Sequence, residues 1–201
     1  ADAIRSAVSV LAIGAQSSLT GGATPMGERL VSTARLNRIL AVGSDEVRVQ
    51  PGVTLAALDE ALGVAGRYYP PAPTFSGAFI GGTVATNAAG AATFKYGTTR
   101  QWVRALTIVL PCGEVLDVER GQIVAHPDGY FDLELSTGTV RVPPPTYQMP
   151  RVPKLSAGYF AATEMDLVDL VVGSEGTLGI VTEITLKVLP EVPAMCVALV
   201  P

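Results

Sequence analysis

The chain has 201 residues, of which 48% are hydrophobic and 16% charged, and its formal net charge is −4. Its Lys and Arg residues are scattered, which argues against nucleic acid as a partner and against a basic membrane-surface patch. Gly, Pro or a charge interrupts every apolar run before it reaches the roughly 18 residues of a membrane-spanning helix, and no signal-peptide pattern is present.

The two cysteines, Cys112 and Cys196, have no metal-ligand spacing, so we predict neither a metal site nor a disulfide framework. We interpret both as small core residues. This usage suits a reducing cytoplasm, with attachment to a membrane through a partner left open. Because the chain begins with Ala and ends in mid-pattern, we interpret it as a fragment.

The first part of the chain is predicted to form short strands followed by one amphipathic helix. Thr54 is a candidate N-cap and Gly66 a candidate C-cap, and Leu55, Leu58 and Leu62 share one face of the helix between them. The preceding elements are a helix end at 1–8, a short buried strand at 9–13, and strands at 30–32 and 46–50.

Hairpins dominate the rest of the chain. Together with the helices they fit an α+β domain rather than a regular βαβ array. A Pro-rich segment at 143–153 is expected to be an extended surface connection. The remaining elements are hairpins at 104–119 and 131–142, a helix or short apolar stretch at 166–172 and an alternating strand at 180–189.

The first of three glycine-rich loops runs from Gly14 to Pro25, directly after a predicted strand. Its small and hydroxyl-bearing residues leave backbone N–H groups free to turn toward one point, as diphosphate binding requires. The loop matches neither the GxGxxG pattern nor a P-loop. From these residues alone, a phosphate cradle and a structural turn are both open.

The second loop runs from Pro70 to Gly90. Its prolines fix an extended entry, while Gly81 and Gly82 permit close backbone approach. Thr86 and Asn87 are polar in an otherwise apolar run, which favours contact with a flat ligand. The alternative is a tightly packed helix start beneath another element.

The third loop, from Val172 to Pro190, joins a glycine-rich turn to an alternating strand. With it, the chain resembles the FAD-linked oxidase family, which has a PCMH-type FAD-binding domain and includes vanillyl-alcohol oxidase. The pattern is closest to the flavin subunits of glycolate and D-lactate dehydrogenases. The segments that carry the resemblance are GAQSSLTGG at 14–22, VQPGVTLAAL at 49–58, IGGTVATN at 80–87, KYGTTRQWV at 95–103 and GSEGTLGIVTE at 173–183.

The resemblance implies an α+β fold in which FAD lies extended between two α/β lobes. The first lobe would span 1–50 and be incomplete at its N-terminus; the second would span 51–201, with an inserted hairpin near 121–152 and no substrate cap domain. The implied FAD-binding residues are Gly14, Ala15, Gln16, Ser17, Ser18, Leu19, Thr20, Pro73, Thr74, Phe75, Ser76, Gly77, Ala78, Phe79, Thr86, Asn87, Ala88, Ala89, Glu175, Gly176, Thr177, Leu178, Gly179, Ile180 and Val181.

The implied reaction is hydride transfer to the flavin from a carbon that bears a hydroxyl, as in a 2-hydroxy acid such as glycolate or D-lactate. Ser17 stands where some relatives attach FAD covalently through a His, which implies non-covalent FAD here. The sole histidine, His126, is interpreted as a solvated loop residue. The small-molecule substrate would be held largely by the cap domain, and the catalytic residues and the electron acceptor are unknown.

Five residues are candidates for positions near the flavin. Lys95, Tyr96 and Arg100 follow the second FAD segment, although Lys95 and Arg100 fit surface charges equally well. Lys154 and Tyr159 resemble a Lys and a Gly-Tyr pair that precede the third FAD loop in relatives.

Two other functions stay open. One is a non-catalytic FAD-binding or assembly subunit, motivated by the absence of a cap. The other is a flavin-dependent transferase like the alkyl-dihydroxyacetone-phosphate synthases. The insertion near 121–152 would cover the flavin edge, contact a partner or decorate the surface.

Overall fold

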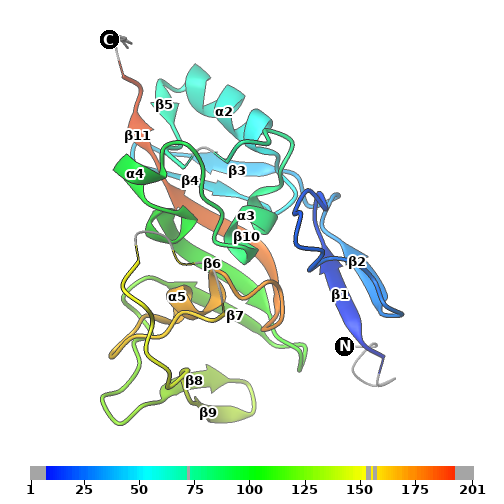
Figure 1. Cartoon of the computed structure of the whole chain (residues 1–201), viewed down its shortest axis with the longest axis vertical. Coiled ribbons are helices and arrows are strands. Elements are labelled where there is room, and N and C mark those ends of the chain that lie inside the picture. Colours follow the sequence, from blue (N-terminus) through cyan, green and yellow to red (C-terminus); the bar gives the residue numbers. More distant parts are fainter. Residues whose placement is uncertain (1–7, 72, 153–154, 156–157, 193–201) are drawn as a thin grey trace.

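An antiparallel five-stranded sheet forms the centre of the protein (Figure 1). The computed structural model describes residues 8–71, 73–152, 155 and 158–192. The strand order is β3-β4-β10-β6-β7, so β10, from late in the chain, is hydrogen-bonded between β4 and β6. These strands are β3 (Ile39–Val42), β4 (Glu46–Val49), β6 (Val103–Val109), β7 (Val115–Glu119) and β10 (Ile180–Lys187).

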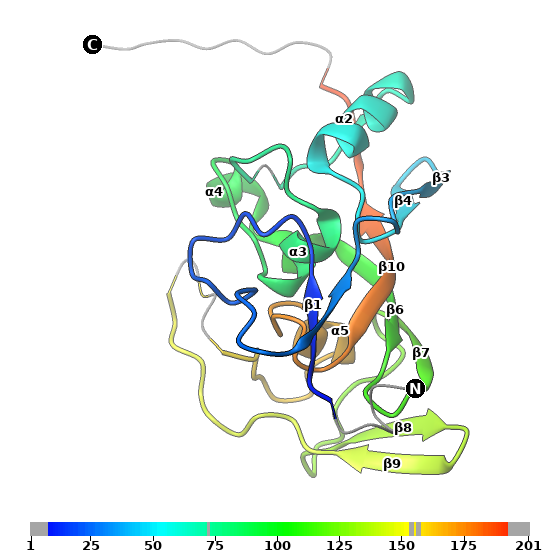
Figure 2. The same ribbon diagram turned by 90° about the vertical axis from the view of Figure 1, so that its right-hand side faces the viewer.

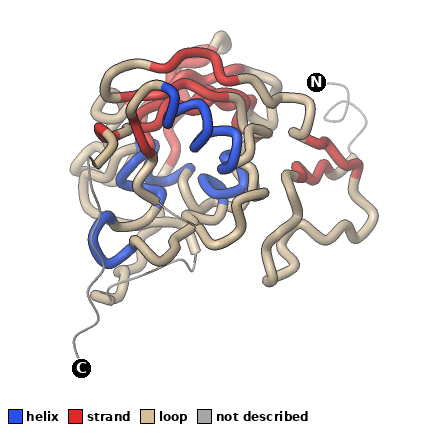
Figure 3. Tube along the Cα trace, turned by 90° about the horizontal axis from the view of Figure 1, so that it is seen from above, coloured by secondary structure: helices blue, strands red, loops and turns tan. Residues whose placement is uncertain are grey.

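One face of this sheet carries the core. Leu106 and Ile108 of β6, and Ile184 and Leu186 of β10, are each 2% exposed or less and alternate with more exposed residues. The helices gather on one side of the sheet, as Figure 3 shows. They are α2 (Leu55–Val64), α3 (Ile80–Ala85), α4 (Thr93–Tyr96), the 3₁₀ helix η1 (Thr99–Trp102) and α5 (Leu167–Val171).

Helix α2 forms where its caps and leucines predict it. The Thr54 side chain accepts a hydrogen bond from the Ala57 N–H at 3.1 Å, and Leu55, Leu58 and Leu62 are buried. Ala65 is the C-cap and the predicted Gly66 follows it with φ +63°. No described helix is long and apolar enough to cross a membrane.

Strands β1 (Val10–Ile13) and β2 (Arg29–Ser32) form a parallel pair beside the main sheet (Figures 1 and 2). Both strands were predicted from sequence, but the expectation that the first is buried is wrong. Val10 is 40% exposed and every residue of β2 is exposed. Within the described residues β1 pairs only with β2, so no neighbouring strand extends the pair into a covered sheet.

The main sheet crosses the expected lobe boundary at Gln50 and Pro51. Strands β3 and β4, which precede that point, pair with each other and with β10. The pair β1–β2 is instead connected to the main sheet through the segment after β2. In this segment the Thr33 N–H donates to the Ile13 carbonyl at 3.0 Å, and the Leu36 carbonyl accepts from the Gly52 N–H at 2.7 Å. The α+β class is confirmed, while the assignment of lobes at 1–50 and 51–201 stays a prediction.

Both predicted hairpins are present. β6 and β7 pair around a turn in which Gly113 has φ +89°, and Cys112 in that turn is exposed, so its assignment to the core is wrong. Cys196 and the expected helix end at 1–7 lie outside the described residues. The remaining strands are β5 (Arg67–Tyr68), β8 (Phe131–Leu135), β9 (Gly138–Val142) and β11 (Leu189–Pro190), with β8 paired to β9 and β5 to β11.

The buried face of α2 predicts a clear difference between two substitutions in the same helix. Leu58→Ala is expected to lower the free energy of unfolding by about 2 to 5 kcal/mol, because Leu58 is fully buried and the smaller side chain leaves a cavity. Val64→Ala, at a residue 90% exposed, is expected to change it by about 0.5 kcal/mol or less. Urea denaturation measures both; equal losses would contradict the packing of α2.

Candidate functional site

A cavity of about 340 Å³ lies where three segments far apart in sequence meet. Its walls come from β1 with the loop after it, from α3 with the loop before it, and from the turn between α5 and β10 (Figure 2). The volume falls in the range of ligand-binding pockets. The three glycine-rich loops singled out in the sequence therefore converge on one space.

The backbone is strained at one position in each of these segments. Gln16, Asn87 and Glu175 have φ values of 51°, 46° and 54°, in the left-handed region that residues with a side chain rarely adopt. Such a conformation costs on the order of 1–3 kcal/mol and persists only where surrounding contacts enforce it. Among the described non-glycine residues, Glu164 alone shares this property elsewhere.

Each strained residue is held by hydrogen bonds. The Gln16 side chain donates from Nε2 to the Ala23 carbonyl at 3.1 Å, which closes the first loop on itself. The Asn87 Oδ1 accepts from the Arg100 N–H at 3.0 Å. The Glu175 N–H donates to the Ala85 carbonyl at 2.8 Å, which ties the third turn to the end of α3.

The third turn lies tightly against the sheet. A Cβ placed on Gly179 would come within 2.7 Å of Ile108 Cγ2 and 2.8 Å of the Val109 carbonyl oxygen, so no larger residue fits without movement. At Gly179 the main chain of the turn therefore packs directly against the end of β6. On the cavity side of the turn, Glu175, Gly176 and Gly179 line the wall.

Most of the predicted FAD-binding residues line this cavity. Those that do are Gly14, Ala15, Gln16, Ser17, Ser18, Thr20, Pro73, Thr74, Phe75, Ala78, Phe79, Thr86, Ala88, Glu175, Gly176, Gly179, Ile180 and Val181. Those that do not are Leu19, Ser76, Gly77, Asn87, Ala89, Thr177 and Leu178. The assignment of individual residues to FAD stays a prediction.

Sequence reasoning missed a further set of lining residues, mainly in β1 and α3. Their small size is the signal that was available, since α3 is the run IGGTVA. From the sequence, the glycines of α3 were interpreted only as permitting close approach of the backbone to a flat ligand. The additional lining residues are Ala12, Ile13, Gly22, Ala23, Thr33, Pro51, Gly81, Gly82, Thr83, Val84, Ala85, Val171 and Ser174.

The cavity is nearly free of ionisable groups. Among the described residues that line it, Glu175 is the only one with an ionisable side chain, and no Lys or Arg is present. Polar character comes from hydroxyls and backbone groups, with Ser17, Ser18 and Thr20 close together in the first loop. Such a lining suits a ligand that is recognised through neutral hydrogen bonds and apolar contact.

Lys95 and Tyr96 do not line the cavity. Lys95 lies over the Tyr96 ring, 4.8 Å from its centroid, and the Tyr96 hydroxyl is 2.7 Å from that of Tyr68. The hydrogen bond from Lys95, reinforced by the one with Tyr68, lowers the pKa of Tyr96, while desolvation and the Tyr96 hydrogen bond raise the pKa of Tyr68 to about 12. This group is an aromatic cluster away from the site.

The other candidates have structural partners as well. The Tyr159 hydroxyl lies 2.6 Å from Thr177 Oγ1 and so supports the third turn from outside the cavity. His126 is half exposed, and its Nδ1 accepts a hydrogen bond from the Asp128 N–H at 3.2 Å, in keeping with a solvated loop residue. Lys154 lies outside the described residues.

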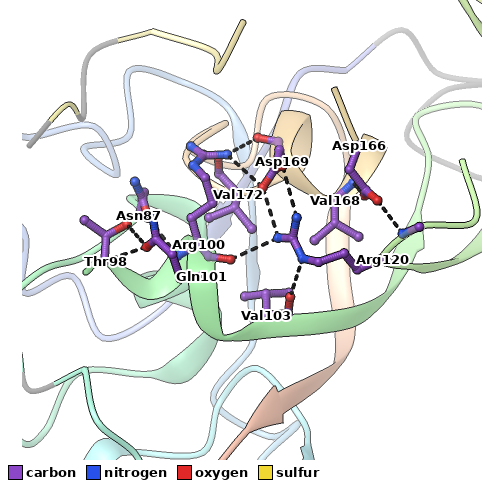
Figure 4. Close-up of polar contacts among 11 residues, drawn as sticks. Asn87, Thr98, Arg100, Gln101, Val103, Arg120, Asp166, Val168, Asp169 and Val172 are labelled. Carbon is purple, nitrogen blue, oxygen red and sulfur yellow. Dashed lines mark hydrogen bonds and ion pairs between the residues drawn. The ribbon is translucent and has the colours of Figure 1, made fainter. Parts of the chain in front are cut away.

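Arg100 is neither a cavity residue nor a surface charge. Its side chain is 12% exposed and bonds to Asp169 and to the Val172 carbonyl, directly behind the third turn (Figure 4). Burial lowers the pKa of its guanidinium, while Asp169 opposes this shift and Arg120 adds to it. The sequence offered no signal for this role, because Arg100 and Asp169 are 69 positions apart.

Three comparisons with known proteins agree with this geometry. A family described as "FAD binding domain" matches residues 1–119. The chain is 37% identical over 191 residues to a D-lactate dehydrogenase of Anaerostipes hadrus, covering 94% of this chain and 33% of that protein. It is 32% identical over 196 residues to the glycolate oxidase subunit GlcD of Escherichia coli, covering 96% of this chain and 32% of that one.

The fold also resembles solved structures of alkyldihydroxyacetonephosphate synthase. One aligns with a TM-score of 0.63 at 22% identity, over 94% of this chain and 30% of the synthase, and at that identity the likeness shows the fold alone. The chain spans about a third of the length of these relatives. The family match covers the first two cavity segments, and the aligned relatives extend over almost the whole chain, which therefore belongs to the family of PCMH-type FAD-binding domains.

Proposed function

We propose that FAD binds non-covalently and extended along the cavity, and that the whole protein is an FAD-dependent dehydrogenase of a 2-hydroxy acid such as glycolate or D-lactate. The observation that carries the proposal is the convergence of the three strained, glycine-rich segments on one cavity. The names of the relatives, a D-lactate dehydrogenase and a glycolate oxidase subunit, support the substrate class.

The residues present suit a dinucleotide. The hydroxyls of Ser17, Ser18 and Thr20 and the small residues around them would hold the diphosphate through neutral donors. Gly82 and Ala85 of α3, which also line the cavity, are small enough for a planar ring to lie close to the backbone. The part of the site built by the third turn would contribute mostly backbone groups.

Non-covalent attachment is supported by what lines the cavity. Ser17 occupies the position where an attaching His would stand, and no His or Cys is among the described lining residues. Acid precipitation of the purified protein is expected to leave all of the FAD in the supernatant. A yellow pellet would contradict this part of the proposal.

The chain itself supplies binding and orientation rather than proton transfer. FAD, when bound, supplies the acceptor for a hydride. Oxidation of a 2-hydroxy acid also requires a base for the hydroxyl proton and a cation for the carboxylate. Because Glu175 is the only ionisable group among the described lining residues, we propose that both come from the part of the protein that this chain does not span.

A second candidate is an FAD-binding subunit that acts within a complex. The lack of a cation among the described lining residues and the relative named as a glycolate oxidase subunit favour it. Its partner would then complete the substrate site. The transferase alternative rests only on structural likeness below 25% identity, so it gains no support here.

Anaerobic reduction of the bound flavin tests the dehydrogenase proposal. We expect glycolate or D-lactate to bleach the visible flavin bands of the purified protein, and the corresponding 2-oxo acid, which has no hydride to give, to leave them unchanged. The absorption spectrum during titration is the measurement. A flavin-containing protein that no member of a 2-hydroxy acid panel bleaches alone, but that bleaches once a partner is added, would favour the subunit instead.

A pair of glycine substitutions tests the place of FAD. A Cβ on Gly82 meets nothing within 4 Å although the residue lines the cavity, so a side chain can start there without a clash and Gly82→Leu is expected to fill part of the cavity. We expect it to weaken FAD binding by about 100-fold or more, since ligand and side chain would occupy one space. Gly63→Leu is the matched control, because Gly63 also lies in a helix with open space around its Cβ.

Fluorescence titration of the apoproteins with FAD measures both affinities. Gly63→Leu is expected to bind as the unsubstituted protein does. If Gly82→Leu binds FAD equally well, the cofactor lies elsewhere.

A further inference from the structure

We propose that Arg100 is a positioning residue that locks two walls of the cavity together and so sets the affinity of the protein for FAD. The inference rests on the proposed function only in placing FAD in this cavity. Figure 4 shows the residues involved, which come from the segment after α3, from η1 and β6, and from α5 with the turn after it. Arg100, Arg120 and Asp169, the charged residues of the link, do not line the cavity.

Arg100 contacts two separate walls with two different parts of the residue. Its backbone N–H donates to Asn87 Oδ1 at 3.0 Å. Its guanidinium donates from Nη2 to the Val172 carbonyl at 2.7 Å and from Nη1 to the Asp169 carbonyl. One residue thus connects the end of the second segment to the start of the third.

Both contacts bear on strained backbone. Asn87 itself has φ 46°, and its neighbours Thr86 and Ala88 line the cavity. Val172 lies two and three residues before Ser174 and Glu175, which both line the cavity, and Glu175 has φ 54°. Because such conformations persist only where several contacts enforce them, loss of Arg100 is expected to relax both walls.

The two walls also touch each other at this point. A Cβ on Gly173 would lie 3.2 Å from Arg100 Nη2 and 3.4 Å from Asn87 Cβ. The Gly173 N–H donates to the Val84 carbonyl at 2.9 Å. Gly173 therefore lies in close contact with both Arg100 and Asn87, and a larger residue at position 173 would require them to move.

The side chain has to be an arginine. A planar guanidinium reaches two carbonyls at once and stacks on an aromatic ring, whereas an ammonium group is a single point charge. Arg100 does both, since its guanidinium lies 4.5 Å from the centroid of the Phe160 ring. The stacking fixes the plane in which the two donors lie.

Arg120 and Asp169 hold Arg100 in place. Arg120 forms a two-pronged pair with the Asp169 carboxylate, with both N–O distances 3.0 Å, and its Nη2 also donates to the Arg100 carbonyl at 3.0 Å. Asp169 Oδ1 is 3.8 Å from Arg100 Nη1. The Arg120 guanidinium thereby fixes both the main chain of Arg100 and the Asp169 carboxylate that pairs with Arg100.

The test compares Arg100→Gln with Arg104→Gln in the protein purified with its FAD and then stripped of it. Arg104 is the matched control, because it carries the same charge on the neighbouring strand but is 41% exposed and pairs with Glu46 at 3.0 Å on the surface. We expect Arg100→Gln to raise the Kd for FAD by about 10- to 100-fold, as loss of charge-assisted hydrogen bonds implies. Arg104→Gln should change it less than about twofold.

A second readout separates positioning from a general loss of stability. The visible absorption bands of the FAD that Arg100→Gln still binds at saturation should shift, since the walls around the flavin have moved. An unchanged Kd overturns the inference, and so does a raised Kd with an unshifted spectrum and a fall in folded fraction that accounts for it. If the unsubstituted protein binds no FAD, the proposed function fails instead.

Two variants at Asn87 test the same inference if Arg100→Gln does not fold. Asn87→Gly removes the acceptor for the Arg100 N–H together with the rest of the side chain, and glycine adopts φ 46° without strain. We expect a rise of about tenfold in the Kd for FAD, and recovery of most of the lost affinity in Asn87→Asp, which keeps an acceptor oxygen. Equal affinities in the two variants would overturn the inference.

Discussion

The hydrogen bonds between the end of α3 and the turn after α5 are the constraint on which the site depends. The carbonyls of Val84 and Ala85 accept the N–H groups of Gly173 and Glu175 at 2.9 and 2.8 Å. A helix end leaves such carbonyls without partners inside the helix, and here the third segment satisfies them. With its first amides used in this way, the turn is pinned beside α3 and its remaining backbone follows the cavity wall.

The turn is also continuous with the most central strand of the sheet. Residues after Gly179 enter β10, which pairs on both sides and whose Ile184 and Leu186 are fully buried. The wall formed by the third segment is therefore held by a core strand and is more rigid than a surface loop. The first segment differs, because β1 pairs only with β2 among the described strands and Val10 is 40% exposed. The wall from the third segment is thus attached to a core strand, whereas the wall from the first segment belongs to an exposed strand pair.

The sequence predicts what depends on local chemistry and misses what depends on distant partners. The cap at Thr54 and both hairpins follow from residue type and spacing, and the structure confirms them. The three glycine-rich segments also stand out by residue type, and they line one cavity. Strand β3 was missed although its partner β4 follows it after a short turn. The pairing of β4 with β10 was missed because β10 lies far along the chain. Asn87 illustrates the same limit: its polarity marks it as unusual, but only the fold shows that its amide faces Arg100.

The placement of charge keeps two cations behind the described walls of the cavity and out of its lining. Arg100 and Arg120 share the Asp169 carboxylate, and both also donate to backbone carbonyls, Arg100 to Val172 and Arg120 to Val103 and Arg100. A positive charge neutralised by fixed dipoles contributes rigidity without offering a free donor to a ligand. The described walls of the cavity thus provide shape and oriented backbone groups, with Glu175 as their only ionisable side chain.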